Sequence, residues 1–597
     1  MKTLFKMLKW REWLFLALTV GLIVLQVWLE LLLPDYTSQL LQYAMLGNSF
    51  SEIWKTGGLM LACALGSAAG NVIGCFLTAQ IAATVSYRLR EAVFAKVESF
   101  SMEEINKFST SSLITRTTND IQQIQMLVSM GTQAIIKAPI LAVWAIFKIL
   151  GTSWEWTVVV ACAVIVMVLM FILVLIVVMP KFRIVQRLTD DVNSVTRENL
   201  TGVRVVRAYN AESYQEEKFE GANDRLTRTQ LFTSRSMSIV SPFMTVLMSG
   251  VTLAIYWVGA YLIDALPTAM ERVTLYSQMV TFSSYAMQII MAFMLLAMIF
   301  VIAPRAMVSL HRVQEVLRTE VRIKEGKISE PPEGSPKGTV EFRNVSFRYP
   351  DAGGNVLENI SFKAERGQTV AFIGATGSGK STAVNLIPRF YDATEGEVLV
   401  DGVNVKDYTF RALHDRIGYV SQKAVLFSGT VDENVTYGEK TDLEYSEEAV
   451  RKAVGVAQGK EFVEKMDGTY HAHIAQGGTN VSGGQKQRLS IARAVYRNPE
   501  IFIFDDSFSA LDYKTDRQLR KALKEETGGA TSLIVAQRIG TIRDADLIIV
   551  LEDGKIAGKG THDELMESCG VYQQIALSQL SKSELEGQLA RGGESNG

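Results

Sequence analysis

Long apolar stretches fill the first half of the chain, whereas the second half alternates short apolar runs with polar segments. Six of the long stretches have few charges and the length that a helix needs to cross a bilayer, which predicts six membrane-spanning helices. Their predicted cores are residues 13–34, 58–82, 134–150, 156–179, 239–262 and 278–304. The third core is the weakest, because Lys137 and Lys148 lie in it. Residues 151–155 alone separate it from the fourth core, which predicts a tight hairpin.

Lysines and arginines are concentrated on one side of these predicted spans. Lys2, Lys6, Lys9 and Arg11 precede the first span, and the long connections after the second and fourth spans are rich in both charges. The opposite connections are short or poor in cations. Since cytoplasmic segments carry an excess of Lys and Arg, both termini and the long connections are expected in the cytoplasm. Each long connection can extend two membrane helices below the bilayer and join them through a short transverse helix.

A glycine-rich loop stands between a strand-like run, residues 369–373, and a helix-like run, residues 383–387. The loop fits the pattern G-x-x-x-x-G-K-[ST] in full, with Gly374, Ala375, Thr376, Gly377, Ser378, Gly379, Lys380, Ser381 and Thr382. Glycines let the backbone wrap around phosphates, and the helix N-terminus that follows favours an anion. Lys380 is expected to reach the terminal phosphates and Ser381 to bind Mg²⁺, with Asp505 at the end of another apolar run on the same ion. The sequence therefore predicts a site for ATP and Mg²⁺.

Further motifs resemble those of ATP-binding cassette (ABC) proteins. Residues 480–488 resemble the signature motif, with Val481 where leucine is usual. The residues that match functional positions of the family are Tyr349, the aromatic that stacks on adenine; Gln422, which senses magnesium and the attacking water; Ser482, Gly483, Gly484 and Gln485, the signature residues that complete a partner's ATP site; and Ser509 and Asp512, in the loop that contacts the opposite subunit. The resemblance covers residues 339–578, and the chain is identified as a member of the ABC superfamily.

This resemblance implies an exporter half-transporter. The fold class is a six-helix transmembrane domain of the ABC exporter type, followed by a cytosolic α/β P-loop nucleotide-binding domain. The predicted boundaries are 1–325 for the transmembrane domain, 326–338 for a linker, 339–580 for the cassette and 581–597 for a disordered tail. The expected location is the plasma membrane of a bacterium. In this family two half-transporters form each working unit.

Two positions depart from the family pattern in a way that affects catalysis. Asp506 stands where the catalytic glutamate is expected, and Gln537 stands where a switch histidine is expected. The shorter carboxylate lies further from the water, and glutamine can neither carry positive charge nor shuttle a proton. The signature is intact, although the preceding residues 476–479 lack the usual acid–arginine–glycine pattern. We therefore expect a degenerate ATP site and a heterodimer whose partner supplies the missing glutamate and histidine; a homodimer with two slow sites is the alternative.

The substrate is the least determined feature. The sixth span carries methionines at helical spacing, which suits either an adaptable cavity or simple packing against a helix or lipid. Lys137 and Glu30 are costly inside a bilayer, so they either line a cavity or lie near the interface. The cavity candidates are Met287, Met291, Met294, Met298, Lys137 and Glu30, with Asn71, Gln133 and Gln288 as weaker ones. Amphipathic drugs are the expected substrates; a lipid flippase, a peptide exporter and a non-transporting regulator are alternatives.

Composition adds two exclusions. The net charge is −2 at pH 7, and no motif for nucleic-acid recognition is present, so no nucleic-acid partner is expected. The four cysteines show no metal-binding spacing, and three of them lie in predicted spans. We expect all four to be reduced residues that serve packing.

Overall fold

The computed structural model describes residues 7–47, 50–438, 444–527 and 529–579, so the predicted tail at 581–597 lies outside the described residues. The chain divides into two compact units. The first is Met1–Glu98 with Ser109–Thr319, and the second is Ser99–Phe108 with Glu320–Gly597. The units therefore separate after Thr319, and residues 99–108, which the sequence had placed in the transmembrane domain, belong to the second unit.

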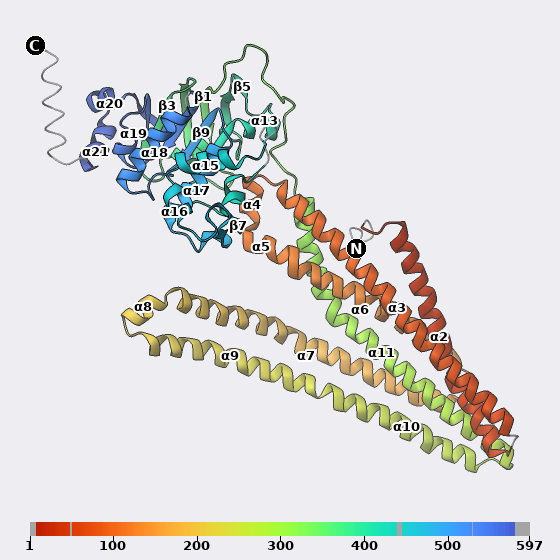
Figure 1. The fold of residues 1–597 in the computed structure, drawn as a ribbon. Helices are drawn as coiled ribbons and strands as arrows, with labels where there is room; N and C mark the ends of the chain where they lie inside the picture. Colours follow the sequence, from red (N-terminus) through yellow and green to blue (C-terminus); the bar gives the residue numbers. More distant parts are fainter. Residues whose placement is uncertain (1–6, 48–49, 439–443, 528, 580–597) are drawn as a thin grey trace, which may run out of the picture. The chain divides into compact units, whose positions relative to one another are not determined.

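The first unit consists of long helical segments (Figure 1). Its elements are α2 (Trp10–Met45), α3 (Phe50–Glu98), α5 (Thr110–Thr115), a π-helical turn (Arg116–Asp120), α6 (Ile121–Ile149), α7 (Trp154–Thr201), α8 (Val203–Ala208), α9 (Glu212–Ser238), α10 (Val240–Asp264) and α11 (Ala269–Arg318). Six segments of the described chain are long and apolar enough to cross a membrane, which confirms the six predicted spans. At 1.5 Å per residue, the 49 residues of α3 extend about 74 Å, far beyond a hydrocarbon core of about 30 Å.

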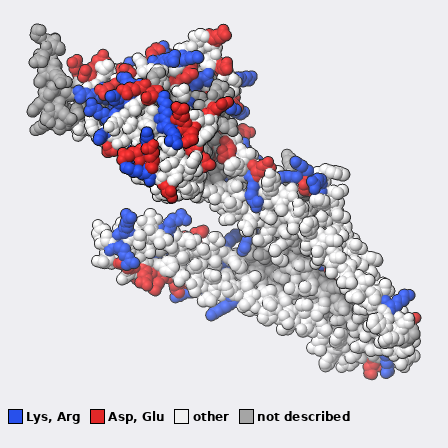
Figure 2. All heavy atoms as spheres, viewed as in Figure 1, with Lys and Arg blue, Asp and Glu red and all other residues white. Residues whose placement is uncertain are grey.

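Helices α2, α3, α6 and α11 pack against one another, and α7 runs beside α9. Val27, Trp156 and Phe282 are among the fully buried side chains of this unit. The tight hairpin is present, since α6 ends at Ile149 and α7 begins at Trp154. In the view of Figure 2, charged side chains are dense over the second unit and sparse along the middle of the long helices. This distribution suits helices whose middle sections contact lipid.

All four cysteines are free thiols. Cys63 and Cys569 are buried, whereas Cys75 and Cys162 are exposed. The expected reduced state agrees with this, and packing accounts for the two buried residues only.

The second unit is built around two larger sheets. Their strands are β1 (Val340–Phe347), β2 (Leu357–Ala364), β3 (Thr369–Gly374), β4 (Glu395–Val400), β5 (Val403–Asn404), β6 (Ile417–Val420), β9 (Ile501–Asp505), β10 (Thr531–Val535), β11 (Leu547–Glu552) and β12 (Lys555–Gly560). One sheet has the antiparallel order β2-β1-β4-β5, and the other has the order β12-β11-β3-β10-β9-β6. In the second sheet all pairs are parallel except β11 with β12. β7 (Gly429–Thr430) and β8 (His473–Ile474) form a small separate pair.

Helices cover the six-stranded sheet (Figure 1). They are α12 (Lys380–Asn385), α13 (Phe410–Asp415), α14 (Val431–Val435), α15 (Glu447–Val456), α16 (Lys460–Glu464), α17 (Gly483–Tyr496), α18 (Tyr513–Glu526), α19 (Ile539–Ile542), α20 (His562–Ser568) and α21 (Gly570–Gln579). The parallel strands are apolar on both faces: every residue of β9 is buried, and its alternate side chains enter two different cores. Continuous apolar runs of this kind are typical of buried parallel strands.

A short helix from early in the chain, α4 (Met102–Phe108), belongs to the second unit. Glu104 is buried there and accepts hydrogen bonds from the Ser101 backbone N–H at 2.9 Å and the Arg322 backbone N–H at 3.2 Å. Glu103 forms an ion pair with Arg322 at 2.6 Å. The segment predicted to contain a short transverse helix is thus anchored by carboxylates to the residues that lead into the cassette.

Candidate functional site

The predicted nucleotide residues converge because four neighbouring parallel strands end at one edge of the sheet. Val535 of β10 pairs with Phe372 of β3 and with Asp505 of β9, and Val420 of β6 pairs with Phe504. The chain leaves all four strands on the same side. The glycine-rich loop follows β3, Asp506 follows β9, Gln537 follows β10 and Gln422 follows β6. Ligand sites of open α/β sheets lie at this carboxyl edge.

Lys380 lies in the loop that the glycines form. Its Nζ donates hydrogen bonds to the carbonyl oxygens of Gly374 at 2.9 Å and Ala375 at 2.7 Å, and to Ser378 Oγ at 3.3 Å. The side chain is buried, and this desolvation lowers its pKa. Gly379 adopts a left-handed conformation at φ +95°, directly before α12, so a side chain there would be strained. The arrangement holds a cation at the start of a helix, where an anion binds well.

Ser381 and Asp505 meet as the sequence predicts for two ligands of one ion. Ser381 Oγ donates a hydrogen bond to Asp505 Oδ1 at 2.7 Å. Burial raises the pKa of Asp505, and the bond from Ser381 opposes that rise. A hydroxyl and a carboxylate are oxygen ligands of the kind Mg²⁺ prefers, so these residues fit that ion.

Asp506 is held by two amides. Its Oδ2 accepts hydrogen bonds from Gln422 Nε2 at 3.2 Å and from Gln537 Nε2 at 2.7 Å. The side chain is buried, which raises the pKa of Asp506, while the bond from Gln422 lowers it. The backbone of Asp506 has φ +48°, a left-handed conformation that aspartate tolerates better than most residues. The three residues that were expected to act on water therefore form one hydrogen-bonded group.

Tyr349 is half-buried beside the loop, and its hydroxyl lies 3.1 Å from Thr382 Oγ1. Its ring meets Tyr391 edge to face, with centroids 5.2 Å apart. The Tyr391 hydroxyl accepts a hydrogen bond of 3.0 Å from Asn106 Nδ2 of α4. Tyr391 could not be predicted from a local pattern, because the contact joins positions 285 residues apart. A chain of three side chains thus connects α4 to the edge of the loop.

The signature residues lie at the start of α17. Ser482 caps this helix: its Oγ accepts from the Gln485 N–H at 3.4 Å, and its own N–H donates to Gln485 Oε1 at 2.8 Å. Ser482 and Gly483 are exposed, and Gly484 and Gln485 are half-buried. In the neighbouring loop, Ser509 and Asp512 are exposed. This loop lies close to the signature: a side-chain carbon added at Gly484 would lie 3.4 Å from the Ala510 carbonyl oxygen. Signature and loop form one accessible surface.

In the first unit, two cavity candidates pair directly. Lys137 Nζ lies 2.9 Å from Glu30 Oε1, although 107 residues separate them. Gln133 Nε2 lies 2.9 Å from Cys75 Sγ, which contacts Asn71 Oδ1 at 3.6 Å. Of the methionine series on α11, Met291 and Met298 are exposed, and Met287 and Met294 are half-buried. The series thus lies partly on the unit's surface.

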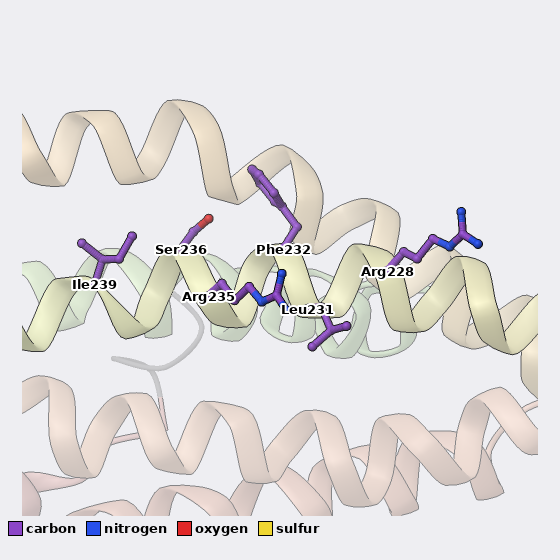
Figure 3. A pocket seen from close by; sticks show the side chains of 6 residues that line it. All are labelled: Arg228, Leu231, Phe232, Arg235, Ser236 and Ile239. Carbon is purple, nitrogen blue, oxygen red and sulfur yellow. The ribbon is translucent and has the colours of Figure 1, made fainter.

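A groove on α9 was not predicted (Figure 3). It is lined by Arg228, Leu231, Phe232, Arg235, Ser236 and Ile239. Phe232 points toward the neighbouring helix, and Lys181 of α7 lies over its ring at 5.8 Å. Asp224 pairs with Arg228 at 2.8 Å. The contact of Lys181 with Phe232 joins α7 to α9, the ion pair lies within α9, and the exposed apolar residues remain at the surface.

Comparisons with known proteins agree with both units. Residues 14–305 match the ABC transporter transmembrane region, and residues 357–509 match the ABC transporter family. An uncharacterized ABC transporter ATP-binding protein of Mycobacterium tuberculosis is 36% identical over 557 residues, which cover 92% of this chain and 93% of that protein. An ATP-dependent lipid A-core flippase of Aromatoleum aromaticum is 30% identical over 511 residues, which cover 86% of this chain and 83% of that protein.

A solved structure supports the same fold. The structure of a bacterial Atm1-family ABC exporter with ATP bound matches with a TM-score of 0.76 at 23% identity, and the match covers 95% of this chain and 98% of that one. The likeness confirms the predicted fold class, a six-helix transmembrane domain of the exporter type followed by a P-loop cassette. With relatives at 30% identity or more along most of its length, the chain belongs to the ABC transporter family.

Proposed function

We propose that this protein is one subunit of an ATP-driven exporter of amphipathic compounds, drugs by default, whose own ATP site is degenerate. The observation that carries the proposal is the group formed by Asp506, Gln422 and Gln537 at the carboxyl edge of the sheet. The cassette and both termini are proposed to lie in the cytoplasm, as the lysine and arginine distribution favours.

ATP binding is assigned to the glycine-rich loop and Tyr349. Lys380 would exchange its carbonyl partners for phosphate oxygens, which offer it charge-assisted bonds. Ser381, Asp505 and Gln422 would hold Mg²⁺, which when bound neutralises charge on the phosphates. The contact of 2.7 Å between Ser381 and Asp505 supports this shared role.

Slow hydrolysis follows from the surroundings of Asp506. A carboxylate that activates water must direct an oxygen at the water and accept its proton. Here the carboxylate is one methylene shorter than glutamate, and both amides donate to one of its oxygens. Amide donors stabilise the ionised form and weaken its basicity, and Gln537 cannot supply the positive charge of a histidine.

The intact signature suggests the complementary role. Exposed Gly483 at the start of α17 offers a backbone N–H, and exposed Ser482 a hydroxyl, to a phosphate that this chain does not itself hold. We therefore propose a heterodimer with a second half-transporter, in which this signature completes the partner's working ATP site. The exposed Ser509 and Asp512 would lie at the contact between subunits.

A lipid flippase is the second candidate. Two ATP-dependent lipid A-core flippases, of Aromatoleum aromaticum and Pseudomonas aeruginosa, are 30% and 29% identical to this chain. Substrate-stimulated ATP hydrolysis with lipids and with amphipathic drugs in parallel separates the two candidates.

The test of the proposal is Mg²⁺-dependent ATP hydrolysis by the chain alone in lipid, and then with the half-transporter encoded beside it. We expect negligible activity alone and strong activity from the pair, because the working site contains the partner's catalytic residues. Brisk hydrolysis by the chain alone would contradict the degenerate site and, with it, the argument for a heterodimer.

Tyr349 provides a test of ATP binding that does not depend on hydrolysis. The Tyr349→Ala variant is expected to bind ATP about tenfold more weakly, since an aromatic stack on a base contributes about 1–3 kcal/mol. Tyr349→Phe keeps the ring and loses only the contact with Thr382, so its affinity should stay near that of the wild type. Equilibrium binding of a fluorescent ATP analogue measures both. Equal weakening in the two variants would assign the effect to the hydroxyl instead.

A further inference from the structure

We propose that the cluster around Glu30 is a binding subsite for the ammonium group of an amphiphile that carries N–H donors, that is, a protonated primary or secondary amine with a hydrocarbon tail. The inference rests on the proposed export function and names its substrate class. All residues of the cluster lie in the first unit, on α2, α3, α6 and α11.

One carboxylate oxygen of Glu30 accepts hydrogen bonds from three side chains on three helices. Its Oε1 accepts hydrogen bonds from Gln26 Nε2 at 2.9 Å, Ser67 Oγ at 3.3 Å and Lys137 Nζ at 2.9 Å. The Glu30 side chain is 27% exposed and that of Lys137 is 19% exposed. The ion pair is therefore accessible to a small group from one side.

Two acceptors in the cluster have no donor. Within the described residues Glu30 Oε2 receives no hydrogen bond, and Gln288 Oε1 is buried without a partner. The Gln288 amide nitrogen donates to the backbone carbonyl oxygen of Glu30 at 3.5 Å, which places the Gln288 side chain beside the Glu30 backbone. A buried acceptor without a donor is costly, so a ligand that brings N–H groups relieves this cost.

The cluster lies far from the nearest end of each helix that forms it. Glu30 lies 15 residues before the end of α2, Lys137 lies 12 residues before the end of α6, and Gln288 lies 19 residues after the start of α11. At 1.5 Å per residue these spacings are about 18 to 28 Å. A hydrocarbon core is about 30 Å thick, so the cluster lies in the membrane-spanning part, where ionisable groups are typically functional.

A shallow apolar groove lies on α6, the helix that carries Lys137. It runs along α6, has a volume of about 520 Å³ and is lined by Pro139, Ile140, Val143, Trp144 and Phe147. Ile140 and Trp144 follow Lys137 by three and seven positions, so they share its face of the helix. A polar cluster and an aromatic-lined groove on α6 together match the head and tail of an amphiphile.

A second ion pair of the same helices serves as the internal control. Asp35 Oδ2 accepts from Lys148 Nζ at 2.6 Å, and Asp35 Oδ1 accepts from the Tyr285 hydroxyl at 2.6 Å. Both oxygens of this carboxylate are occupied. The pair links α2, α6 and α11, and unlike Glu30 it has no carboxylate oxygen without a donor.

The test measures equilibrium binding to the transporter, purified with its partner and reconstituted in lipid, without ATP. The ligands are a long-chain primary alkylamine and the trimethylammonium compound with the same chain, which has no N–H. The wild type should bind the primary amine about tenfold more tightly or better, since hydrogen bonds to charged groups are strong. Glu30→Gln and Gln288→Met should remove this preference, and Asp35→Asn should retain it.

Each outcome decides the proposal. Equal affinity of the two ligands in the wild type, or an unchanged preference in Gln288→Met, overturns it. If Glu30→Gln fails to fold because Lys137 loses its partner, Gln288→Met still decides, since it keeps the ion pair. The charge-exchanged Glu30→Lys/Lys137→Glu variant keeps a bridge but removes the carboxylate from position 30, so a preserved preference there also overturns the proposal. Because no ATP is present, failure here leaves the degenerate-site proposal standing, and the hydrolysis assays test that separately.

Discussion

Asp506→Glu combined with Gln537→His is expected to raise ATP hydrolysis by the chain alone roughly tenfold to a hundredfold. Misplacement of a reacting group by about 1 Å costs on the order of a hundredfold in rate, and the longer carboxylate corrects that distance. The histidine also removes the amide that donates to Asp506 Oδ2 at 2.7 Å. Steady-state phosphate release from the double variant in lipid is the measurement.

The matched control for this gain is Asp506→Asn, which keeps the shape and removes the base. It should show no rise, and neither should the double variant when Lys380→Met is added, because ATP binding is then lost. Glutamate at position 506 must adopt the left-handed backbone seen at φ +48°, so the folded fraction should be checked by thermal unfolding. A correctly folded double variant with unchanged turnover would show that these two positions do not limit the site.

In the proposed heterodimer, Gly483→Asp is expected to reduce ATP hydrolysis by about a hundredfold or more. A carboxylate at the start of α17 repels the phosphates of the partner's nucleotide, and loss of one oxyanion donor alone costs about 10²–10³ in rate. The substitution should not disturb folding: no atom lies within 4 Å of a side-chain carbon added at Gly483, and acidic residues suit a helix N-terminus.

Two comparisons make this result specific. Gly483→Asn has the same shape without the charge and should retain much more activity. If the site on this chain is degenerate as proposed, Lys380→Met weakens that site alone, and hydrolysis by the pair should fall far less than with Gly483→Asp. The reverse order, with Lys380→Met the more damaging variant, would mean that this chain contains the main catalytic site and would refute the proposed division of labour.

Several residues that the sequence predicts for the cassette site lie together in the structure, because local patterns specify the strands and loops that carry them. A glycine-rich loop between a strand and a helix typically binds phosphate. Gln422, Asp506 and Gln537 lie close together because each follows one of three neighbouring parallel strands. Contacts between residues far apart in the sequence could not be predicted. The pairing of Lys137 with Glu30 depends on how four helices pack, and the link from Asn106 to Tyr391 depends on where α4 lies. The sequence pattern around Lys137 or Asn106 does not indicate which residue either side chain contacts.

The membership of α4 in the second unit has a consequence for how the protein is made. Glu104 leaves the ribosome 218 residues before Arg322, the residue whose N–H it accepts. At synthesis rates of about 5–20 residues per second, roughly 10 to 40 seconds pass between the synthesis of Glu104 and that of Arg322. A recombinant fragment that starts after Thr319 lacks α4 altogether and leaves the Tyr391 hydroxyl without its donor from Asn106. The isolated cassette would therefore lack the hydrogen bonds that link α4 to Tyr391 and Arg322 in the intact chain.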